Sequence, residues 1–220
     1  MTSSAEARRR PGWITVVFAI MVLAGHGGSL SGQQDGPRVL VRSVSDGDTI
    51  VLEGGQRVRY LGIDAPEVAH EGQPGEPYGD TAARYNRTLV SGRRVMLEFE
   101  RDRHDDYGRL LAYVFVEDGT LANDELVRQG LAYVCRRQQP LRYWDHLLES
   151  QRRAMKERRG LWSLPPPRPE PVYLGNKRSW IFHRASCPLG RDMKPTSLVR
   201  FEDRSHAFSE GFCPCRRCRP

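Results

Sequence analysis

The sequence predicts a small β-barrel with helices packed on it, followed by a short basic module that cysteine and histidine side chains stabilise. Five β-patterned runs and three helix-periodic runs lie between residues 38 and 163, and a proline-rich stretch follows them. Hydrophobic residues make up 39% of the 220 residues, and no apolar run reaches 18 residues. The composition therefore excludes a polytopic membrane protein and favours a folded, turn-rich chain.

The five predicted strands are short runs rich in β-branched and aromatic residues. Gly54-Gly55 separates two of them, as is typical of a hairpin. Residues 93–100 alternate apolar and polar side chains, which indicates a half-buried strand. The predicted strands cover residues 39–44, 48–53, 57–63, 93–100 and 109–116.

Helical periodicity appears in three places, at residues 78–90, 120–131 and 144–159. Gly130 and Gly160 fall where the second and third helices should stop. We expect residues 164–171, which contain five prolines, to form a linker that separates the core of residues 38–163 from a second core in residues 172–220.

The net charge of +7 is unevenly placed. Residues 165–220 carry 11 basic and 5 acidic side chains, which gives +6, whereas residues 32–164 carry 20 basic and 21 acidic ones, which gives −1. A basic C-terminal quarter points to a polyanionic partner, and nucleic acid is the partner we expect.

Residues 1–31 are predicted to be a secretory signal peptide or an N-terminal anchor. Arg8, Arg9 and Arg10 precede a 12-residue apolar run at 13–24, and small residues follow it. A buried core helix is the alternative, and the basic start and Gly-rich exit argue against it. We therefore expect a secreted, periplasmic or cell-envelope protein, in contact with a membrane only if this segment stays uncleaved.

Carboxylates and arginines gather in three motifs of the predicted barrel. Asp48, Asp64 and Glu67 offer the oxygen ligands that Ca²⁺ or Mg²⁺ prefers. Arg59 and Arg109 offer planar forks that match phosphate oxygens. Each motif alone is more often a turn or a helix cap, so the order and spacing of all three carry the argument. The motifs are DGDT at 46–49, RYLGIDAPE at 59–67 and DDYGR at 105–109.

Strand alternation over residues 57–63 predicts that Arg59 shares a face with Arg57, Leu61 and Ile63. A charge among apolar neighbours is costly unless an anion or an acid meets it.

Together with YGDTA at 78–82, NDELVRQGLA at 123–132 and GLWS at 160–163, these motifs resemble the staphylococcal-nuclease-type thermonuclease family. The resemblance covers residues 38–163 and implies an OB-fold, a five-stranded barrel with about three helices. It implies an endonuclease that hydrolyses DNA and RNA with Ca²⁺ and leaves 3′-phosphates. Its implied site is a calcium bound by Asp48, Asp64 and the Ala65 carbonyl, an outer Asp46, the general base Glu67, and the phosphate-binding pair Arg59 and Arg109.

Some positions depart from the family pattern. Ala65 replaces a threonine whose backbone oxygen is the ligand, so little should be lost. Asp106 and Arg136 stand where the family has nucleotide-contacting lysine and tyrosine, which puts contacts to the substrate terminus in doubt. The alternative function is an inactive OB-fold module that binds nucleic acid or protein at the cell surface. Such a copy would lack Arg59, Glu67 or Arg109, and all three are present.

The C-terminal module, residues 172–220, is predicted to bind one Zn²⁺. His183 and Cys187 are four residues apart, and Cys215 and Cys218 form a C-x2-C pair 28 residues after Cys187. So short a segment buries little hydrophobic core and needs a metal ion or a disulfide to be stable. The module resembles the zinc module of bacterial alkylation-repair proteins, with His183 in place of one cysteine.

Disulfides are the alternative to zinc, because export favours them, although five cysteines are an odd number. In that case the module would be a disulfide-bonded interaction knob. Cys135 is interpreted as a small buried residue, and Cys213 as a spare thiol or an alternative ligand. We expect the module to aid nucleic-acid binding, and we expect a monomer without a small-molecule cofactor.

Overall fold

The computed structural model describes Met1 and residues 38–136, 140–165 and 168–220. The predicted signal segment lies outside these residues, except for Met1. The chain divides into two units, Met1–Leu30 and Ser31–Pro220, and the second is described below. Within the described ranges, no helix is both long and apolar enough to cross a membrane.

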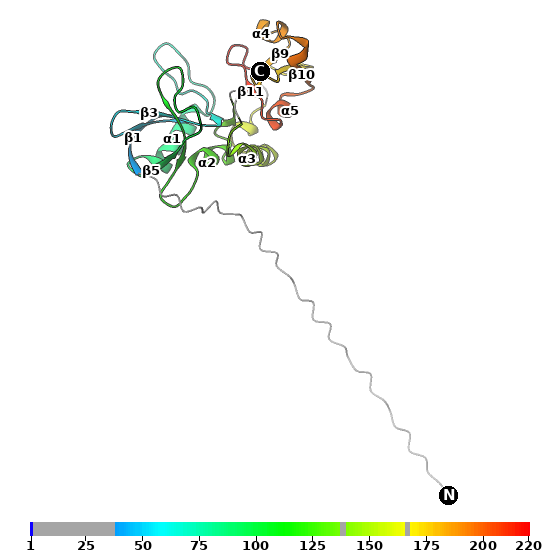
Figure 1. The fold of residues 1–220 in the computed structure, drawn as a ribbon. Coiled ribbons are helices and arrows are strands. Elements are labelled where there is room, and N and C mark those ends of the chain that lie inside the picture. Colours follow the sequence, from blue (N-terminus) through cyan, green and yellow to red (C-terminus); the bar gives the residue numbers. More distant parts are fainter. Residues whose placement is uncertain (2–37, 137–139, 166–167) are drawn as a thin grey trace. The chain divides into compact units, whose positions relative to one another are not determined.

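The body of the protein is a closed barrel of five strands in the order β1-β2-β3-β6-β5 (Figure 1). Antiparallel pairs join consecutive strands β1 to β3 and β5 to β6, and β3 pairs with β6 in parallel through Val58 and Leu110. The strands span Arg38–Asp46 (β1), Thr49–Leu52 (β2), Arg57–Tyr60 (β3), Arg94–Glu98 (β5) and Leu110–Phe115 (β6). The predicted barrel is confirmed.

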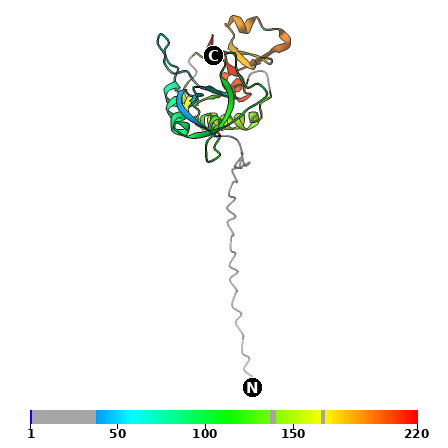
Figure 2. The same cartoon turned by 60° about the vertical axis from the view of Figure 1, so that its left-hand side comes forward.

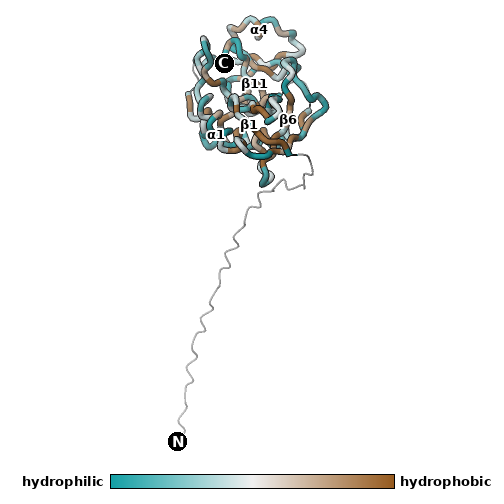
Figure 3. The backbone as a smooth tube through the Cα atoms, turned by 90° about the vertical axis from the view of Figure 1, so that its left-hand side faces the viewer, coloured by the Kyte–Doolittle hydropathy of each residue, from teal (hydrophilic) through white to brown (hydrophobic). Residues whose placement is uncertain are grey.

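Apolar side chains of these strands fill the barrel, and Figure 3 shows hydrophobic residues interspersed with hydrophilic ones along the backbone of this part. Val41, Ile50, Val58 and Val95 have no exposed surface, as the alternation of their strands predicts. The buried hydroxyl of Tyr60 donates to Asn86 at 2.9 Å, so the barrel is tied to the first helix.

Three helices cover the barrel, close to their predicted bounds (Figure 2). They are α1 (Gly79–Val90), α2 (Ala122–Arg128) and α3 (Trp144–Lys156). The buried residues of α3 include Leu147, Leu148, Gln151 and Ala154, which recur at three- and four-residue spacing.

The predicted strand at 57–63 is interrupted in the structure. Gly62 adopts a positive φ of 79°, which ends β3 at Tyr60, and its carbonyl accepts from the Cys135 amide at 2.8 Å. The chain then enters β4 (Ile63–Asp64), which pairs with β7 (Tyr133–Val134). Ile63 therefore does not share a strand with Arg59. The prediction that the strand continues past residue 60, with Leu61 and Ile63 on the face of Arg59, is wrong.

The C-terminal module contains a four-stranded sheet in the order β10-β8-β9-β11 and two short helices. Its core is aromatic, with Tyr173, Phe182, Phe201, Phe208 and Phe212 buried. The strands are β8 (Tyr173–Asn176), β9 (Ile181–Arg184), β10 (Leu198–Phe201) and β11 (Cys213–Pro214), and the helices are α4 (Pro188–Arg191) and α5 (Arg204–Ser209).

The body and the module have distinct hydrophobic clusters, but the proline-rich segment does not hold them apart, because they pack directly against each other. Tyr133 stacks on Phe208 with ring centroids 5.0 Å apart, and Trp162 meets the same ring edge-on at 4.9 Å. Gln151, buried on α3, donates to the Phe208 carbonyl at 2.6 Å. Burial of these aromatic rings favours packing of the module onto the body, and the linker sequence alone does not reveal it.

Candidate active site

Asp46 and Asp48 occupy the tight turn between β1 and β2. A carboxylate oxygen of Asp46 accepts from the Asp48 amide at 3.1 Å, which is a typical Asx turn. Asp48 is only 1% exposed, and its carboxylate accepts from the Ala65 amide at 2.5 Å and the Thr49 hydroxyl at 3.2 Å. These bonds fix the Asp48 carboxylate beside the Ala65 backbone.

The Arg59 guanidinium joins the predicted metal ligands. Its Nη1 forms an ion pair with Asp48 and its Nη2 one with Asp64, so the two carboxylates converge on one planar fork. Burial lowers the pKa of Arg59, while the charges of Asp64 and Asp46 oppose that shift. Burial also raises the pKa of Asp46, against the charge of Arg59. The opposite charges of the acids and of Arg59 thus partly offset the cost of burying them.

Glu67 lies on the loop after β4, against the start of α1. Its amide donates to Glu76 at 3.2 Å, and its side chain is 45% exposed. A Cβ at Gly79 would lie 2.2 Å from the Glu67 carbonyl oxygen, so only glycine allows the helix to begin this close. Gly79 therefore allows the start of α1 to pack directly against the backbone of Glu67.

Arg109 lies at the entry to β6 and engages a different acid. Its Nε donates to Asp105 at 2.7 Å, and its guanidinium lies 5.5 Å from the centroid of the Tyr107 ring, which is exposed. Within the described part of the chain its ion pair is with Asp105. Its charge, like that of Arg59, opposes the rise that burial causes in the pKa of Asp46.

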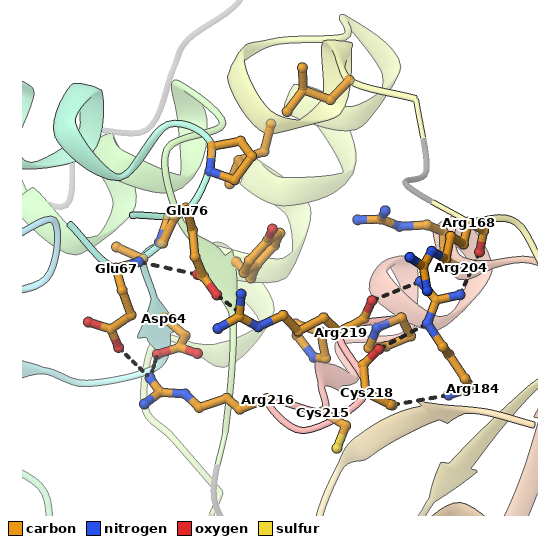
Figure 4. A pocket seen from close by; sticks show the side chains of 18 of the residues that line it. Asp64, Glu67, Glu76, Arg168, Arg184, Arg204, Cys215, Arg216, Cys218 and Arg219 are labelled. Atoms are coloured by element: carbon orange, nitrogen blue, oxygen red, sulfur yellow. Dashed lines mark hydrogen bonds and ion pairs between the residues drawn. The ribbon is translucent and has the colours of Figure 1, made fainter. Parts of the chain in front are cut away.

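An arginine of the C-terminal module enters the same site, and sequence reasoning missed it. Nη2 of Arg216 lies 2.7 Å from Asp64 and 3.2 Å from Glu67 (Figure 4). These carboxylates and that of Glu76 raise the pKa of Arg216, with Asp64 the largest cause. The only sequence signal was its position between Cys215 and Cys218, which says nothing of a distant partner.

A disulfide joins Cys135, just after β7, to Cys213 in β11. Cys135, interpreted as a small buried residue, is half-buried and forms this bond, and the interpretation of Cys213 as a spare thiol or an alternative ligand is wrong. The bond closes a loop of 78 residues, and one of its sulfurs lies within 4.8 Å of an Asp64 carboxylate oxygen. The bond therefore fixes the module beside Asp64, and Cys213 lies three residues before Arg216 in the sequence.

The four predicted zinc ligands come together in the module. Nδ1 or Nε2 of His183 and the sulfurs of Cys187, Cys215 and Cys218 all lie within 4.8 Å of one another, and the first three residues are buried. Ligand atoms around a tetrahedral zinc are about 3.5 to 4 Å apart, given bonds near 2.0 to 2.3 Å. The cluster therefore has the donor set and the spacing for one such ion.

The structure places two of the positions that depart from the family pattern, Arg136 and Asp106. The Arg136 guanidinium lies over the rings of Trp180, at 3.5 Å, and Trp144, at 4.8 Å. It therefore connects α3 with the module rather than facing the acids. Asp106 is exposed beside Tyr107.

A closed five-stranded barrel that brings acids and arginines together at one end fits the nuclease class that the sequence motifs indicated. Residues 57–164 match the model of the staphylococcal nuclease homologue family. The thermonuclease of Staphylococcus intermedius is 36% identical over 130 residues, which cover 58% of this chain and 77% of that protein. The thermonuclease of Staphylococcus hyicus is 30% identical over 164 residues, covering 69% and 96%. The chain belongs to the staphylococcal nuclease family.

The SPbeta prophage-derived endonuclease YokF of Bacillus subtilis is 42% identical over 123 residues. That match covers 54% of this chain and 41% of YokF, so the chain spans less than half the length of YokF. The family match ends at residue 164, before the C-terminal module begins.

Proposed function

We propose that the protein is an exported, calcium-dependent endonuclease that hydrolyses phosphodiester bonds of DNA and RNA and leaves 3′-phosphates. The observation that carries the proposal is the convergence of Asp48 and Asp64 on Arg59, with Glu67 beside Asp64 through their shared contact to Arg216. Family membership supports the chemistry, and the apolar run at 13–24 supports export.

The acids fit a calcium ion by their chemistry. Asp48 and Asp64 are hard oxygen donors facing a common cation, which at present is the guanidinium of Arg59. Asp48, Asp64 and the Ala65 carbonyl would hold the ion, and Asp46 would support Asp48 from outside. Bound there, the ion would supply positive charge against the charge that builds up on the phosphate.

The side chains of this chain would divide the remaining work. Glu67, half exposed on its loop, would take the proton of the attacking water. Arg59 would hold the phosphate oxygens, and Arg109 would offset the charge of the departing 5′-oxygen, which then takes up a proton. The phosphorus–5′-oxygen bond breaks as the water oxygen bonds to phosphorus, so the phosphate stays on the 3′ side.

A nuclease assay tests the proposal directly. We expect release of acid-soluble nucleotides from DNA and RNA with Ca²⁺ and none with chelator. Glu67→Gln should lose about 10² or more in turnover, the scale of removing a positioned base, whereas Glu71→Gln, exposed on the same loop, should not. Full activity in chelator, or in Glu67→Gln, would contradict the mechanism. An inactive binding module, the alternative function, would bind nucleic acid and cleave none.

For the C-terminal module we propose one Zn²⁺ held by His183, Cys187, Cys215 and Cys218, a structural role, and a contribution to nucleic-acid binding. The clustering of the four donors supports it. Elemental analysis should find one zinc per chain. A thiol titration of the denatured protein in chelator should find three thiols without reductant and five with it, because one disulfide accompanies the cluster. A single thiol without reductant would show a second disulfide in place of zinc.

A further inference from the structure

A cavity of about 770 Å³ lies between the barrel and the C-terminal module, and we call it the interface cavity. Asp64, Glu67 and Glu76 line its barrel side, and Arg204, Arg216 and Arg219 line its module side (Figure 4). Its volume is within the range of about 300 to 1,000 Å³ of pockets that bind small ligands. It therefore has room for a nucleotide unit directly beside the candidate catalytic acids.

The backbone that carries Arg216 and Arg219 is held from several sides. Cys213 is in the disulfide to the barrel, and Cys215 and Cys218 belong to the cluster. The Arg219 amide donates to the Cys215 carbonyl at 2.9 Å. The two guanidinium-bearing side chains are nonetheless 62% and 68% exposed. Fixed backbone and accessible charge are what a phosphate-binding arginine needs.

These arginines have weak or replaceable partners. Arg219 lies 3.6 Å from Glu76, beyond hydrogen-bond distance. Arg216 is paired with the acids that the proposed function assigns to metal and proton transfer. Arg204 lies over the Phe208 ring at 5.2 Å, burial lowers its pKa, and it has no ion pair among those formed in the described residues. All three cations would gain from an anion in the cavity.

Arg184 also lines the interface cavity, but its role is different. Its guanidinium donates to Glu170 and to the carbonyls of Arg168, Cys218 and Arg219, at 2.6 to 3.1 Å. A side chain that is satisfied in this way holds the module together and is not free for a ligand.

We propose that the interface cavity is a subsite for the phosphodiester backbone of the polynucleotide next to the scissile bond, with Arg204, Arg216 and Arg219 as its phosphate ligands. This inference rests on the proposed function. Arg216 moves from Asp64 and Glu67 to a substrate phosphate once a metal ion takes over the acids. The site then holds one phosphate at the barrel arginines and a neighbouring one at the module arginines, and recognition depends on substrate length.

The test measures binding of single-stranded DNA oligonucleotides of 2 to 12 nucleotides with Ca²⁺ in a Glu67→Gln background. We expect Arg219→Gln and Arg216→Gln to weaken binding of the longer oligonucleotides about fivefold and to leave the dinucleotide unchanged. The slope of log affinity against log salt should fall by about 0.7 for each arginine removed. Arg204→Gln should act likewise if it folds, and the exposed Arg216 and Arg219 keep the test valid if it does not.

Arg217→Gln is the matched control, because Arg217 is exposed in the same segment, carries the same charge and does not line the cavity. It should change neither the length dependence nor the slope beyond experimental error. Equal effects of Arg217→Gln and Arg219→Gln would overturn the subsite and leave only diffuse charge attraction. Unchanged binding in Arg219→Gln and Arg216→Gln would overturn it as well. A wild-type protein that cleaves no polynucleotide would instead overturn the proposed function, and the binding data would show which had failed.

Discussion

Arg216 lies 2.7 Å from the same carboxylate oxygen of Asp64 that Arg59 contacts, although 152 residues separate it from Asp64 in the sequence. The Asp64 carboxylate is thus shared between one arginine of the barrel and one of the C-terminal module. A carboxylate with two cationic partners is a poorer ligand for a metal ion than a free one, because the ion must displace at least one of them. If Asp64 binds a metal ion as proposed, the module would influence metal binding in the barrel through Arg216.

Removing Arg216 should tighten calcium binding. We expect Arg216→Gln to lower the Ca²⁺ dissociation constant about two- to fivefold, the scale of losing a largely exposed ion pair of about 0.4 to 1 kcal/mol. Isothermal titration of the metal-free protein measures this without any turnover. Arg217→Gln, with the same change of net charge, should bind calcium like the wild type. Weaker binding in Arg216→Gln would show that this arginine supports the metal site rather than competing with it.

Arg59→Lys should be strongly impaired although it keeps the positive charge. In the proposed mechanism the planar fork of Arg59 holds two phosphate oxygens, whereas an ammonium is a point charge that cannot reproduce the fork. We expect turnover on DNA to fall about 10²-fold, as for other losses of a positioned charge stabiliser. Arg57→Lys, exposed on the same strand, is the control and should retain turnover. Near-normal turnover of Arg59→Lys would mean that net charge alone matters there.

The Cys135–Cys213 disulfide should contribute about 2 to 4 kcal/mol to the free energy of unfolding, since it closes a loop of 78 residues. Cys213→Ser should lose this amount in urea denaturation. Reductant should destabilise the wild type similarly and leave Cys213→Ser unaffected. If reductant destabilises Cys213→Ser equally, its target is the Cys/His cluster and the disulfide contributes little.

A chain truncated after Ser163 should be less stable than the full protein, in contrast to the independent body that the proline-rich segment suggests. Truncation removes the rings that cover Tyr133 and Trp162 and the acceptor of the buried Gln151 amide. Each ring left uncovered costs about 1 to 2 kcal/mol, and loss of the Gln151 hydrogen bond about 0.5 to 1.5 kcal/mol. Thermal unfolding should show a clearly lower Tm, and an unchanged Tm would show that the cores are independent after all.

A milder variant separates packing from chain length in the same experiment. Phe208→Ala in the full chain should also lower Tm, because Phe208 is fully buried between Tyr133, Trp162 and Phe182. Leu189→Ala, exposed in the same module, should leave Tm nearly unchanged. If Phe208→Ala leaves Tm as nearly unchanged as Leu189→Ala does, the interface does not stabilise the body.

The sequence by itself determined the barrel, its helices and the acids and arginines placed on it. Local periodicity and turn residues are short-range signals, so 93–100 and 109–116 could be assigned without knowledge of their neighbours. The spacing of His183, Cys187, Cys215 and Cys218 likewise predicted a cluster that the structure brings together, because metal-ligand pairs are local patterns too.

Only the tertiary structure decided which distant parts meet. The break at Gly62 depends on a hydrogen bond to Cys135, and the pairing of Cys135 with Cys213 depends on how the module docks. The contact of Arg216 with Asp64 follows from that docking. Docking is driven by the non-directional burial of aromatic rings such as Phe208, and this burial leaves no periodic or spacing pattern in the sequence. For this reason the sequence predicted a separate module, whereas in the structure the module lines the candidate active site.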